Sequence, residues 1–582
     1  MSDAVDAALA RRTDLDQFGT AKRLLFAVQL SLRIEDIHAV AAEALTDGPD
    51  DKSCDFILVD RGERSVVIAQ GYESTSARRK EAPQAKAGSL HQAINWLFGS
   101  RQASEVPQRL RGAWQELHDA LNDGEIDQIA IWFVHNREES KNVAVELEAV
   151  QKTAYQLVRA RYKHDLTVIA EELGVNTLLD RYEGSRTPIL VTDKFTVQVT
   201  GSFLESGDNW TALCTSVSAA WLQEQFTKYG SRIFSANVRG YLGSIRSENN
   251  INNGIQNTLR EHPEKFWAYN NGITALVHDF SADDDDSTVS VTGIAIVNGA
   301  QTTGSIGSVT DHPVASSRLL ARFIKCDDAD TVREIIRYNN RQNPTLASDF
   351  RSNDRIQTKL VREFNDLGVA GYNGGRRGGA EDVIRRPGDN QLAADVAAQA
   401  LAAFHGRPDV SYHEKSKIWE DSSIYGSVFP ERTTAPHVLF VYSLLKAVER
   451  QKVSLGGKSS SNQTEEDNEL IEWFKLRGSA QIAVAAIGAT SEILLGAAIP
   501  DRYTMRFKKV SSVGEAIDTW TPVVVAMLAL APNQLSAPLE GTGGLRRREV
   551  VGAAISTFRG LISATSKVNR PIYSTFAEAV EI

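Results

Sequence analysis

The pattern of apolar and polar residues changes twice along the chain. Helical and strand periods alternate in residues 1–185, which predicts an α/β domain with a mixed sheet. Strand patterns and turns are denser in residues 186–393, which predict an α+β core. Helical patterns dominate residues 394–582 and predict a helical C-terminal region. The length of 582 residues fits this multidomain organisation, since domains of about 150 residues would give roughly four of them.

The first region has the clearest order of elements. An amphipathic helix near 34–46 precedes two strand-like runs, CDFILVD (54–60) and RSVVIAQGY (64–72), which a short turn joins. Further helices, a buried strand at 126–136 and a long helix at about 142–162 follow. We therefore expect 54–60 and 64–72 to be adjacent strands of the predicted mixed sheet.

The second region carries several local signals. Ser218 is placed to cap a helix that stops at Gly230. The segment FWAYNNGITALV (266–277) predicts a hairpin, because Asn-Gly supplies the positive φ angles of a tight turn. The strand pattern VSVTGIAIV (289–297) leads into NGAQTTGSIG (298–307), which predicts a strand-to-helix connection.

Composition narrows the class of protein. The charge balance of 64 Lys and Arg against 74 Asp and Glu gives −10, which argues against coating nucleic acid through bulk positive charge. Three cysteines without a CxxC pair exclude a Cys-rich zinc site and favour a reducing cytoplasm. The start of the chain lacks the pattern of a signal peptide. The apolar run at 522–532 is too short for a membrane span, so we expect a cytoplasmic protein without a membrane partner.

Three asparagine-rich clusters stand out in the second region, at 230–276, 296–306 and 335–354. Asparagine combines an acceptor and a donor on one short arm and tolerates left-handed backbone. Each cluster alone is most simply explained as a turn or a helix end. Three clusters within one region also fit a shared polar site or an amide network.

A concrete expectation follows for two of these clusters. NNG and NGAQTT each lie at the end of a predicted strand, and both carry amide side chains. We therefore expect Asn270, Asn298 and Gln301 to lie near one another. If they do not, the interpretation as separate turns remains.

The order of these motifs resembles the AIPR family, bacterial proteins named for abortive-infection phage resistance. The resemblance covers about 230–430 and includes DVAAQALAAFHGRP and KSKIWEDSSIYGSVF. It implies antiviral defence. The residues that match the family pattern are Arg239, Asn270, Asn271, Gly272, Asn298, Gly299, Gln301, Thr302 and Thr303.

AIPR proteins often carry an N-terminal region similar to Mrr-like, PD-(D/E)XK nucleases, which cleave phosphodiesters with a divalent metal ion. That resemblance implies a carboxylate at the start of one strand and a Glu or Gln on the next. Asp55 and Gln70 match these positions, and Glu43 ends the preceding helix. We expect these three residues to hold Mg²⁺ through oxygen ligands.

The sequence departs from the nuclease pattern at Tyr72, where the family has lysine. A phenol is neutral at pH 7 and does not replace an ammonium ion. Lys80 or Lys86 is our candidate for a lysine that has migrated to the next segment. Two alternatives stay open, a degenerate fold that only binds and a wrong assignment of the domain.

An arginine-rich loop at 372–389 is a candidate nucleic-acid contact, although a solvated surface loop explains it as well. The residues we expect to contact nucleic acid are Arg239, Asn270, Asn271, Asn298, Gln301, Thr302, Arg376 and Arg377.

The expected function is metal-dependent cleavage or binding of nucleic acid triggered by infection, with DNA and RNA both open. The second hypothesis is a non-catalytic sensor or adaptor that binds nucleic acid or a phage component. A third is a regulator of a neighbouring restriction or modification system. A homo-oligomer is also open.

Overall fold

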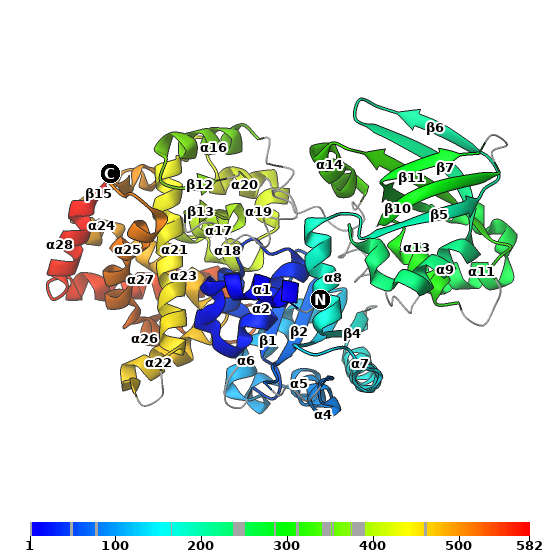
Figure 1. Ribbon diagram of the computed structural model, residues 1–582. Helices are drawn as coiled ribbons and strands as arrows, with labels where there is room; N and C mark the ends of the chain where they lie inside the picture. Colours follow the sequence, from blue (N-terminus) through cyan, green and yellow to red (C-terminus); the bar gives the residue numbers. More distant parts are fainter. Residues whose placement is uncertain are drawn as a thin grey trace.

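The computed structural model has three parts, an N-terminal α/β domain, a central sheet domain and a helical region (Figure 1). In Figure 1 the N-terminal domain lies beside the helical region, and the central domain lies on the other side of α8. The structure describes residues 3–46, 51–75, 80–163, 166–236, 251–283, 287–309, 314–339, 351, 354–372, 374, 390–458 and 462–582.

The N-terminal domain is built on a four-stranded sheet in the order β1-β2-β3-β4. Its strands are β1 (Phe56–Asp60), β2 (Ser65–Tyr72), β3 (Gln128–His135) and β4 (Thr167–Leu173). β1 and β2 form an antiparallel hairpin, and β2, β3 and β4 run parallel. The predicted mixed sheet, with 54–60 beside 64–72, is confirmed.

Helices cover both faces of this sheet, because the strands are apolar on both sides. Val67 and Ala69 face one core, and Val66 and Ile68 face the other. The first core holds α1 (Asp3–Arg11), α2 (Lys22–Leu32), α3 (Ile37–Ala44) and α8 (Val175–Arg186). The second holds α4 (Gln84–Gly88), α5 (Leu90–Ile94), α6 (Gln108–Asn122) and α7 (Lys141–Arg161).

The central domain has a larger sheet in the order β5-β10-β8-β11-β7-β6, with β9 paired to β10. Its strands are β5 (Val191–Gln198), β6 (Ser202–Ser206), β7 (Trp210–Ser218), β8 (Ile273–Val277), β9 (Asp279–Ala282), β10 (Thr288–Asn298) and β11 (Arg318–Cys326). One face packs against α9 (Ala219–Tyr229), α11 (Ile251–Glu261), α12 (Phe266–Tyr269) and α13 (Ala300–Gly307). The other face packs against α14 (Ala329–Asn339).

Of the local predictions in this domain, the capped helix is confirmed and the hairpin is wrong. Ser218 caps α9 by accepting from the Trp221 amide, and the helix ends before Gly230, as predicted. The hairpin predicted at 266–277 is wrong, since α12 occupies its first half. β8 instead pairs with β10, which follows β9, and with β11, which comes later in the chain. Asn271-Gly272 instead lies in the connection from α12 to β8, where Gly272 has a φ of 75°.

The helical region has one large hydrophobic core, which extends from Leu360 to Val580. The boundary predicted at 393/394 falls inside it, because Leu360 and Phe364 of α16 pack with the later helices. Its helices of eight residues or more are α16 (Arg355–Leu367), α17 (Ala394–Phe404), α21 (Ala435–Gly456), α22 (Glu465–Phe474), α23 (Ser479–Ala489), α25 (Val513–Leu528), α27 (Arg548–Thr565) and α28 (Arg570–Ala579).

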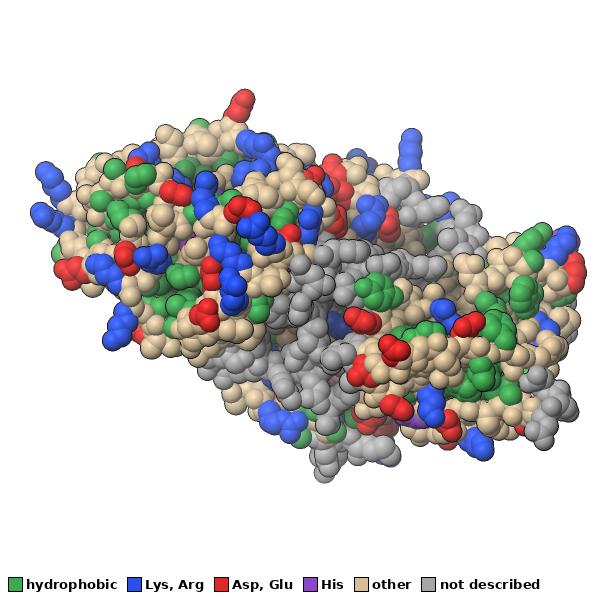
Figure 2. All heavy atoms as spheres, turned by 90° about the horizontal axis from the view of Figure 1, so that it is seen from above, with side chains coloured by type: hydrophobic (Ala, Val, Ile, Leu, Met, Phe, Trp, Pro, Cys, Tyr) green, Lys and Arg blue, Asp and Glu red, His purple; other side chains and the backbone are tan. Residues whose placement is uncertain are grey.

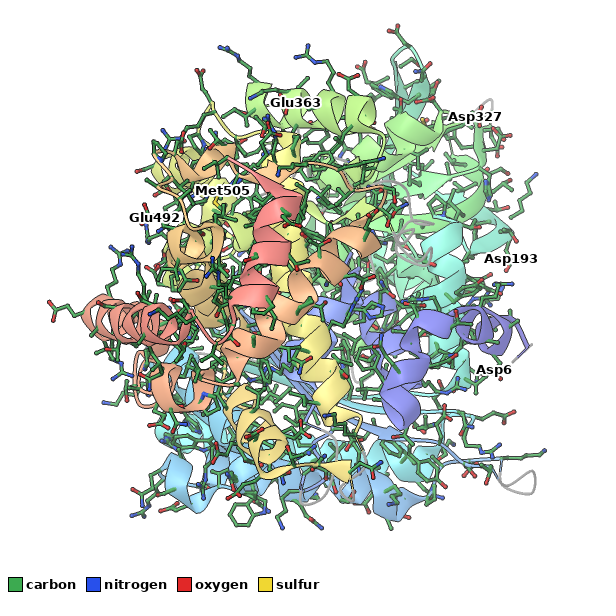
Figure 3. The ribbon with its side chains drawn as sticks, turned by 90° about the vertical axis from the view of Figure 1, so that its left-hand side faces the viewer. Asp6, Asp193, Asp327, Glu363, Glu492 and Met505 are labelled. Atoms are coloured by element: carbon green, nitrogen blue, oxygen red, sulfur yellow. The ribbon has the colours of Figure 1, made fainter. Side chains whose placement is uncertain are left out.

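Shorter elements complete this region. They are β12 (Gly371–Tyr372), β13 (Gln391–Leu392), α18 (Pro408–His413), α19 (Lys417–Glu420), α20 (Ser422–Val428), α24 (Ser491–Leu495), β14 (Arg506–Phe507), α26 (Ala531–Leu535) and β15 (Val580–Glu581). Figure 3 views the molecule from the helical end, with Glu492 and Met505 in this region and Asp6 on the N-terminal helices. No described helix is long and apolar enough to span a bilayer.

Candidate functional site

The β1–β2 hairpin brings Asp55 and Gln70 together. Phe56 lies opposite Ala69 in the antiparallel register, which places Asp55 opposite Gln70 at the next step. The Asp55 carboxylate accepts a hydrogen bond of 2.7 Å from the amide of Gly71. That bond fixes the carboxylate beside the strand that carries Gln70.

Gln70 is held from the other side by the start of α5. Its side chain is buried, on the face of β2 that packs against α4 to α7. The Ser89 hydroxyl lies 3.1 Å from Gln70 Oε1 and 2.7 Å from the carbonyl oxygen of Lys86. Ser89 thus links Gln70 to the helical turn that carries Lys86, whose side chain is exposed.

The two lysine candidates lie on segments that make different contacts. Lys80 is exposed, and its carbonyl accepts from the Glu138 amide beyond the end of β3. Tyr72 follows Gln70 on the same face of β2, and its ring stacks on Phe133 with a centroid distance of 6.4 Å. Tyr72 is therefore part of the packing, and Lys86 is the lysine whose segment contacts Gln70.

Glu43 is used elsewhere, contrary to the prediction. Its carboxylate pairs with Lys415 of the helical region, with 3.2 Å between Oε2 and Nζ. The cavity that it lines is bounded by Val67 and Trp132, on the sheet face opposite Gln70. The structure therefore does not bring Glu43 together with Gln70, because an interdomain ion pair holds its side chain.

The remaining oxygen donors limit what cation this site fits. Within the described ranges, no group of three or more His, Cys, Asp or Glu side chains is placed to hold a metal ion. Asp55 and Gln70 offer one carboxylate and one amide oxygen. That pair fits Mg²⁺, which is commonly bound by one or two carboxylates together with water and substrate phosphates. It does not fit a closed all-protein cage.

A second polar cluster lies where β8 begins and β10 ends. Asn270 Nδ2 lies 3.2 Å from Thr302 Oγ1, and Asn270 Oδ1 accepts from the Gly272 amide at 2.8 Å. Asn298 pairs with Thr274 across the two strands. The NNG and NGAQTT motifs therefore meet in space. Thr302 makes the side-chain contact and directly follows Gln301.

Aromatic side chains flank this cluster. Trp267 is 50% exposed and Tyr269 is 70% exposed, although both are large apolar groups. Asn271 is also exposed. Sequence reasoning did not single out the two aromatic residues, because it assigned them to a strand of the predicted hairpin at 266–277. Arg239, Arg376 and Arg377 lie outside the described residues.

The surface of the helical region has mixed charge on the face that Figure 2 shows. Figure 2 shows basic and acidic side chains interspersed over the helical region in that view, without a field of one sign. On this face of the helical region, any contact with phosphates is therefore expected to be local.

A comparison with protein-family models decides the family. The AIPR protein model matches residues 234–529, more than half of the 582 residues. The chain belongs to the AIPR family. This membership indicates a role in abortive-infection defence against phages. Searches of curated proteins and of solved structures found no match.

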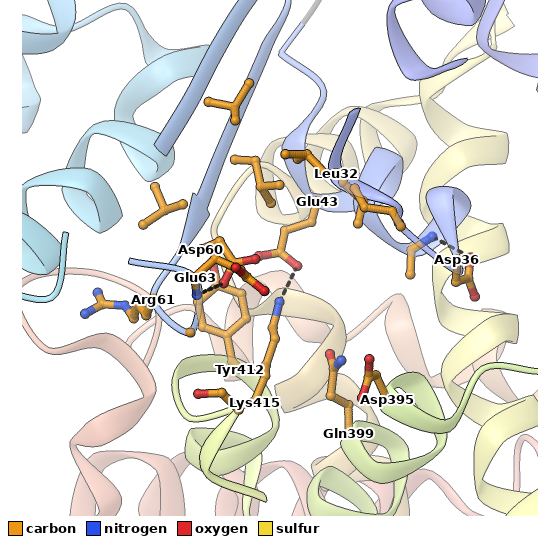
Figure 4. A pocket seen from close by; sticks show the side chains of 18 of the residues that line it. Leu32, Asp36, Glu43, Asp60, Arg61, Glu63, Asp395, Gln399, Tyr412 and Lys415 are labelled. Atoms are coloured by element: carbon orange, nitrogen blue, oxygen red, sulfur yellow. Dashed lines mark hydrogen bonds and ion pairs between the residues drawn. The ribbon is translucent and has the colours of Figure 1, made fainter. Parts of the chain in front are cut away.

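The AIPR chain also holds a cavity that the sequence did not predict, between the N-terminal sheet and the helical region. It measures about 330 Å³ and is lined by β1, α3, α18 and α21, among other elements. Figure 4 shows Glu43 and Lys415 paired across it, with Tyr412 beside them. Burial alone would raise the pKa of Glu43, but the Lys415 and Arg477 charges outweigh burial and lower it.

Proposed function

We propose that this AIPR protein cleaves nucleic acid during phage infection, with Asp55, Gln70 and Lys86 at its site. The observation that carries the proposal is the placement of Asp55 opposite Gln70 on the β1–β2 hairpin, with Ser89 joining Gln70 to the turn of Lys86. This arrangement combines a carboxylate, a neutral oxygen and a nearby cation source. Phosphodiester hydrolysis with a divalent metal ion uses these same groups.

Each residue has a distinct role in this proposal. Asp55 supplies the anionic ligand, and the Gly71 amide orients its carboxylate. Gln70 supplies an amide oxygen that Ser89 positions. Mg²⁺, when bound, would polarise the phosphate and activate a water molecule. The flexible side chain of Lys86 can place its ammonium beside the negative charge that develops on the phosphate.

The test is Asp55→Ala in the full chain. We expect cleavage of DNA or RNA to fall at least about a hundredfold, because the only side-chain carboxylate of the proposed site is lost. Cleavage is measured on single- and double-stranded DNA and RNA with Mg²⁺ or Mn²⁺, beside a phage-protection assay in cells. Asp518→Ala is the matched control, since the Asp518 side chain is 71% exposed on the helical region.

Gln70→Glu gives a variant with the opposite expected effect. A second carboxylate binds a hard cation more strongly than an amide, so half-maximal cleavage should need less Mg²⁺. Unchanged cleavage in Asp55→Ala would refute the catalytic assignment. Protection that survives Asp55→Ala, with folding intact, would favour the second candidate.

That second candidate is a non-catalytic nucleic-acid sensor. The observation that favours it is the exposure of Trp267 and Tyr269 beside the Asn270–Thr302 contact. Exposed aromatic rings can stack on unpaired bases, and neighbouring amides can bond to base edges. In this case the N-terminal domain would only bind, and binding of single strands would persist without cleavage.

A further inference from the structure

A second and smaller cavity, about 140 Å³, lies next to the large one at the junction of the N-terminal domain and the helical region. Residues of α3 and α6 contribute one wall, and α21 and α22 contribute the other. The two cavities share four lining residues, which are Ala42, Glu43, Lys452 and Arg477.

Basic side chains outnumber acidic ones around the small cavity. Four basic side chains line it, namely Arg109, Lys452, Lys475 and Arg477. Glu43 is the one acidic residue among its lining residues, and that carboxylate is paired with Lys415. Lys475 pairs with Glu472 beside the cavity. An excess of positive charge therefore remains at a partly buried place.

Arg477 contributes most of its bonds to main-chain oxygens. Its terminal nitrogens donate to the carbonyls of Glu43 and Ile57, the latter at 2.9 Å. The Glu116 carboxylate forms an ion pair with Arg477, with 3.7 Å between Oε2 and Nε, and offsets part of its charge. The carbonyl groups position the guanidinium but carry no net charge, so Lys452 is the lining cation that decides the charge balance of the cavity.

Lys452 is the least compensated of the four. Within the described ranges, no carboxylate lies at ion-pair distance from its ammonium, which sits 5.8 Å from the centre of the Phe474 ring. Burial and the neighbouring Arg477 charge lower the pKa of Lys452 to about 8. A bound anion beside Lys452 would therefore offset a charge that no described carboxylate pairs with.

We propose that the small cavity binds a phosphate group, with Lys452 and Arg477 as its principal contacts. The phosphate would be either free phosphate or the phosphate of a nucleotide. In the second case the nucleoside would extend into the large cavity past the shared residues. Arginine offers a planar fork for two phosphate oxygens and lysine a point charge. Because the walls come from two regions of the fold, the ligand would also clamp them together.

The experiment measures phosphate binding to the full chain by calorimetry and by thermal unfolding. The probes are inorganic phosphate, adenosine monophosphate and adenosine, each at constant ionic strength with chloride as the reference anion. We expect saturable binding of a phosphate-bearing probe and a rise of Tm that follows its occupancy. Tighter binding of adenosine monophosphate than of phosphate identifies a nucleotide, and equal binding identifies free phosphate.

Variants test the contacts. Lys452→Met should weaken binding at least about tenfold, whereas Lys452→Arg should retain most of it. Lys152→Met is the control, since the Lys152 side chain is 70% exposed on α7. If Lys452→Met fails to fold, Lys475→Met on the same cavity replaces it. Binding no stronger than that of chloride, or unchanged binding in Lys452→Met, would overturn the proposal. Neither result depends on cleavage by the Asp55 site.

Discussion

Gly272 shows how closely the backbones approach at the Asn270 cluster. Its φ is 75°, and a Cβ at this position would lie 2.0 Å from the carbonyl oxygen of Leu320. Gly299, at the end of β10, is equally constrained, since a Cβ there would lie 2.6 Å from the Gly272 oxygen. Gly272 therefore lets the start of β8 lie against β11, and Gly299 lets the start of α13 lie against β8.

We predict that Gly272→Ala lowers the free energy of unfolding by roughly 2 to 5 kcal/mol, from left-handed backbone strain and the clash with Leu320. Urea unfolding measures the change. Gly552→Ala is the matched control, because Gly552 is exposed within α27 and a Cβ there meets nothing within 4 Å. The control should gain about 0.5 to 1 kcal/mol. A loss below about 1 kcal/mol in Gly272→Ala would contradict the steric argument.

The positions of Asp55 and Gln70 could be read from the sequence, because a period of two and a short turn fix the register of a hairpin. The ion pair that Glu43 forms could not be read from the sequence. Its partner Lys415 lies far away in sequence, and no local pattern reveals an ion pair across an interface. Trp267 and Tyr269 were misassigned for a related reason, since tertiary packing decided between helix and strand.

At the scale of elements, the end of α17 and the helix α21 are joined by two histidines, the half-buried His405 and the buried His437. His405 Nε2 and His437 Nε2 lie 3.0 Å apart, and His437 Nδ1 lies 2.9 Å from the Met505 carbonyl oxygen. The His405 ring stacks on Tyr503 with a centroid distance of 3.8 Å. Burial lowers the pKa of His437 to about 4, and burial and His437 together lower the pKa of His405 to about 2.

These shifts predict acid sensitivity. Below about pH 6.5 the unfolded histidines take up protons that the folded ones refuse. Stability is therefore fully present above about 6.5 and is lost as the pH falls towards 4, by up to about 1.4 kcal/mol per pH unit for each histidine. His437→Gln should reduce this slope in urea unfolding at pH 7.5, 6.5 and 5.5. A slope equal to that of the unchanged protein would refute the assignment.

At the scale of the whole molecule, charged side chains attach the N-terminal domain to the helical region. Asp36 caps α3 by accepting from the Ala39 amide, and it also pairs with Lys446 of α21 at 2.9 Å. Arg546 reaches Asp123 and Glu125 from the other end of the chain. Because these contacts join distant segments, the two regions should unfold together.

We predict that Asp36→Ala costs roughly 2 to 4 kcal/mol, because it removes a helix cap and one carboxylate partner of Lys446, whose side chain is only 15% exposed. It should also separate the unfolding transition of the N-terminal domain from that of the helical region. Asp36→Asn keeps the cap and loses only the charge, so its effect should be smaller. Calorimetry of both variants measures the transitions. A single transition of unchanged Tm in Asp36→Ala would count against this coupling.

The mixed α/β character and the helical C-terminal region were visible in the sequence, because helical and strand periods differ along the chain. The two cavities were not, because their walls combine segments from both ends of the chain. The packing of Leu360 and Phe364 with the helices beyond the predicted boundary at 393/394 was hidden for the same reason. Tertiary packing assigns α16 to the helical core, and no change in the local sequence pattern marks this.

The order of strands in the central sheet determines where the chain can be cut into fragments that fold. The family match begins at residue 234, but β7 lies between β11 and β6 in the sheet, and β5 pairs with β10. A fragment cut at the match would lose Leu213, Val217 and Leu222 from the core, and β11 would become an open edge. The residues that match the family model are thus fewer than the residues that this domain needs to fold. An expression fragment should begin upstream of β5.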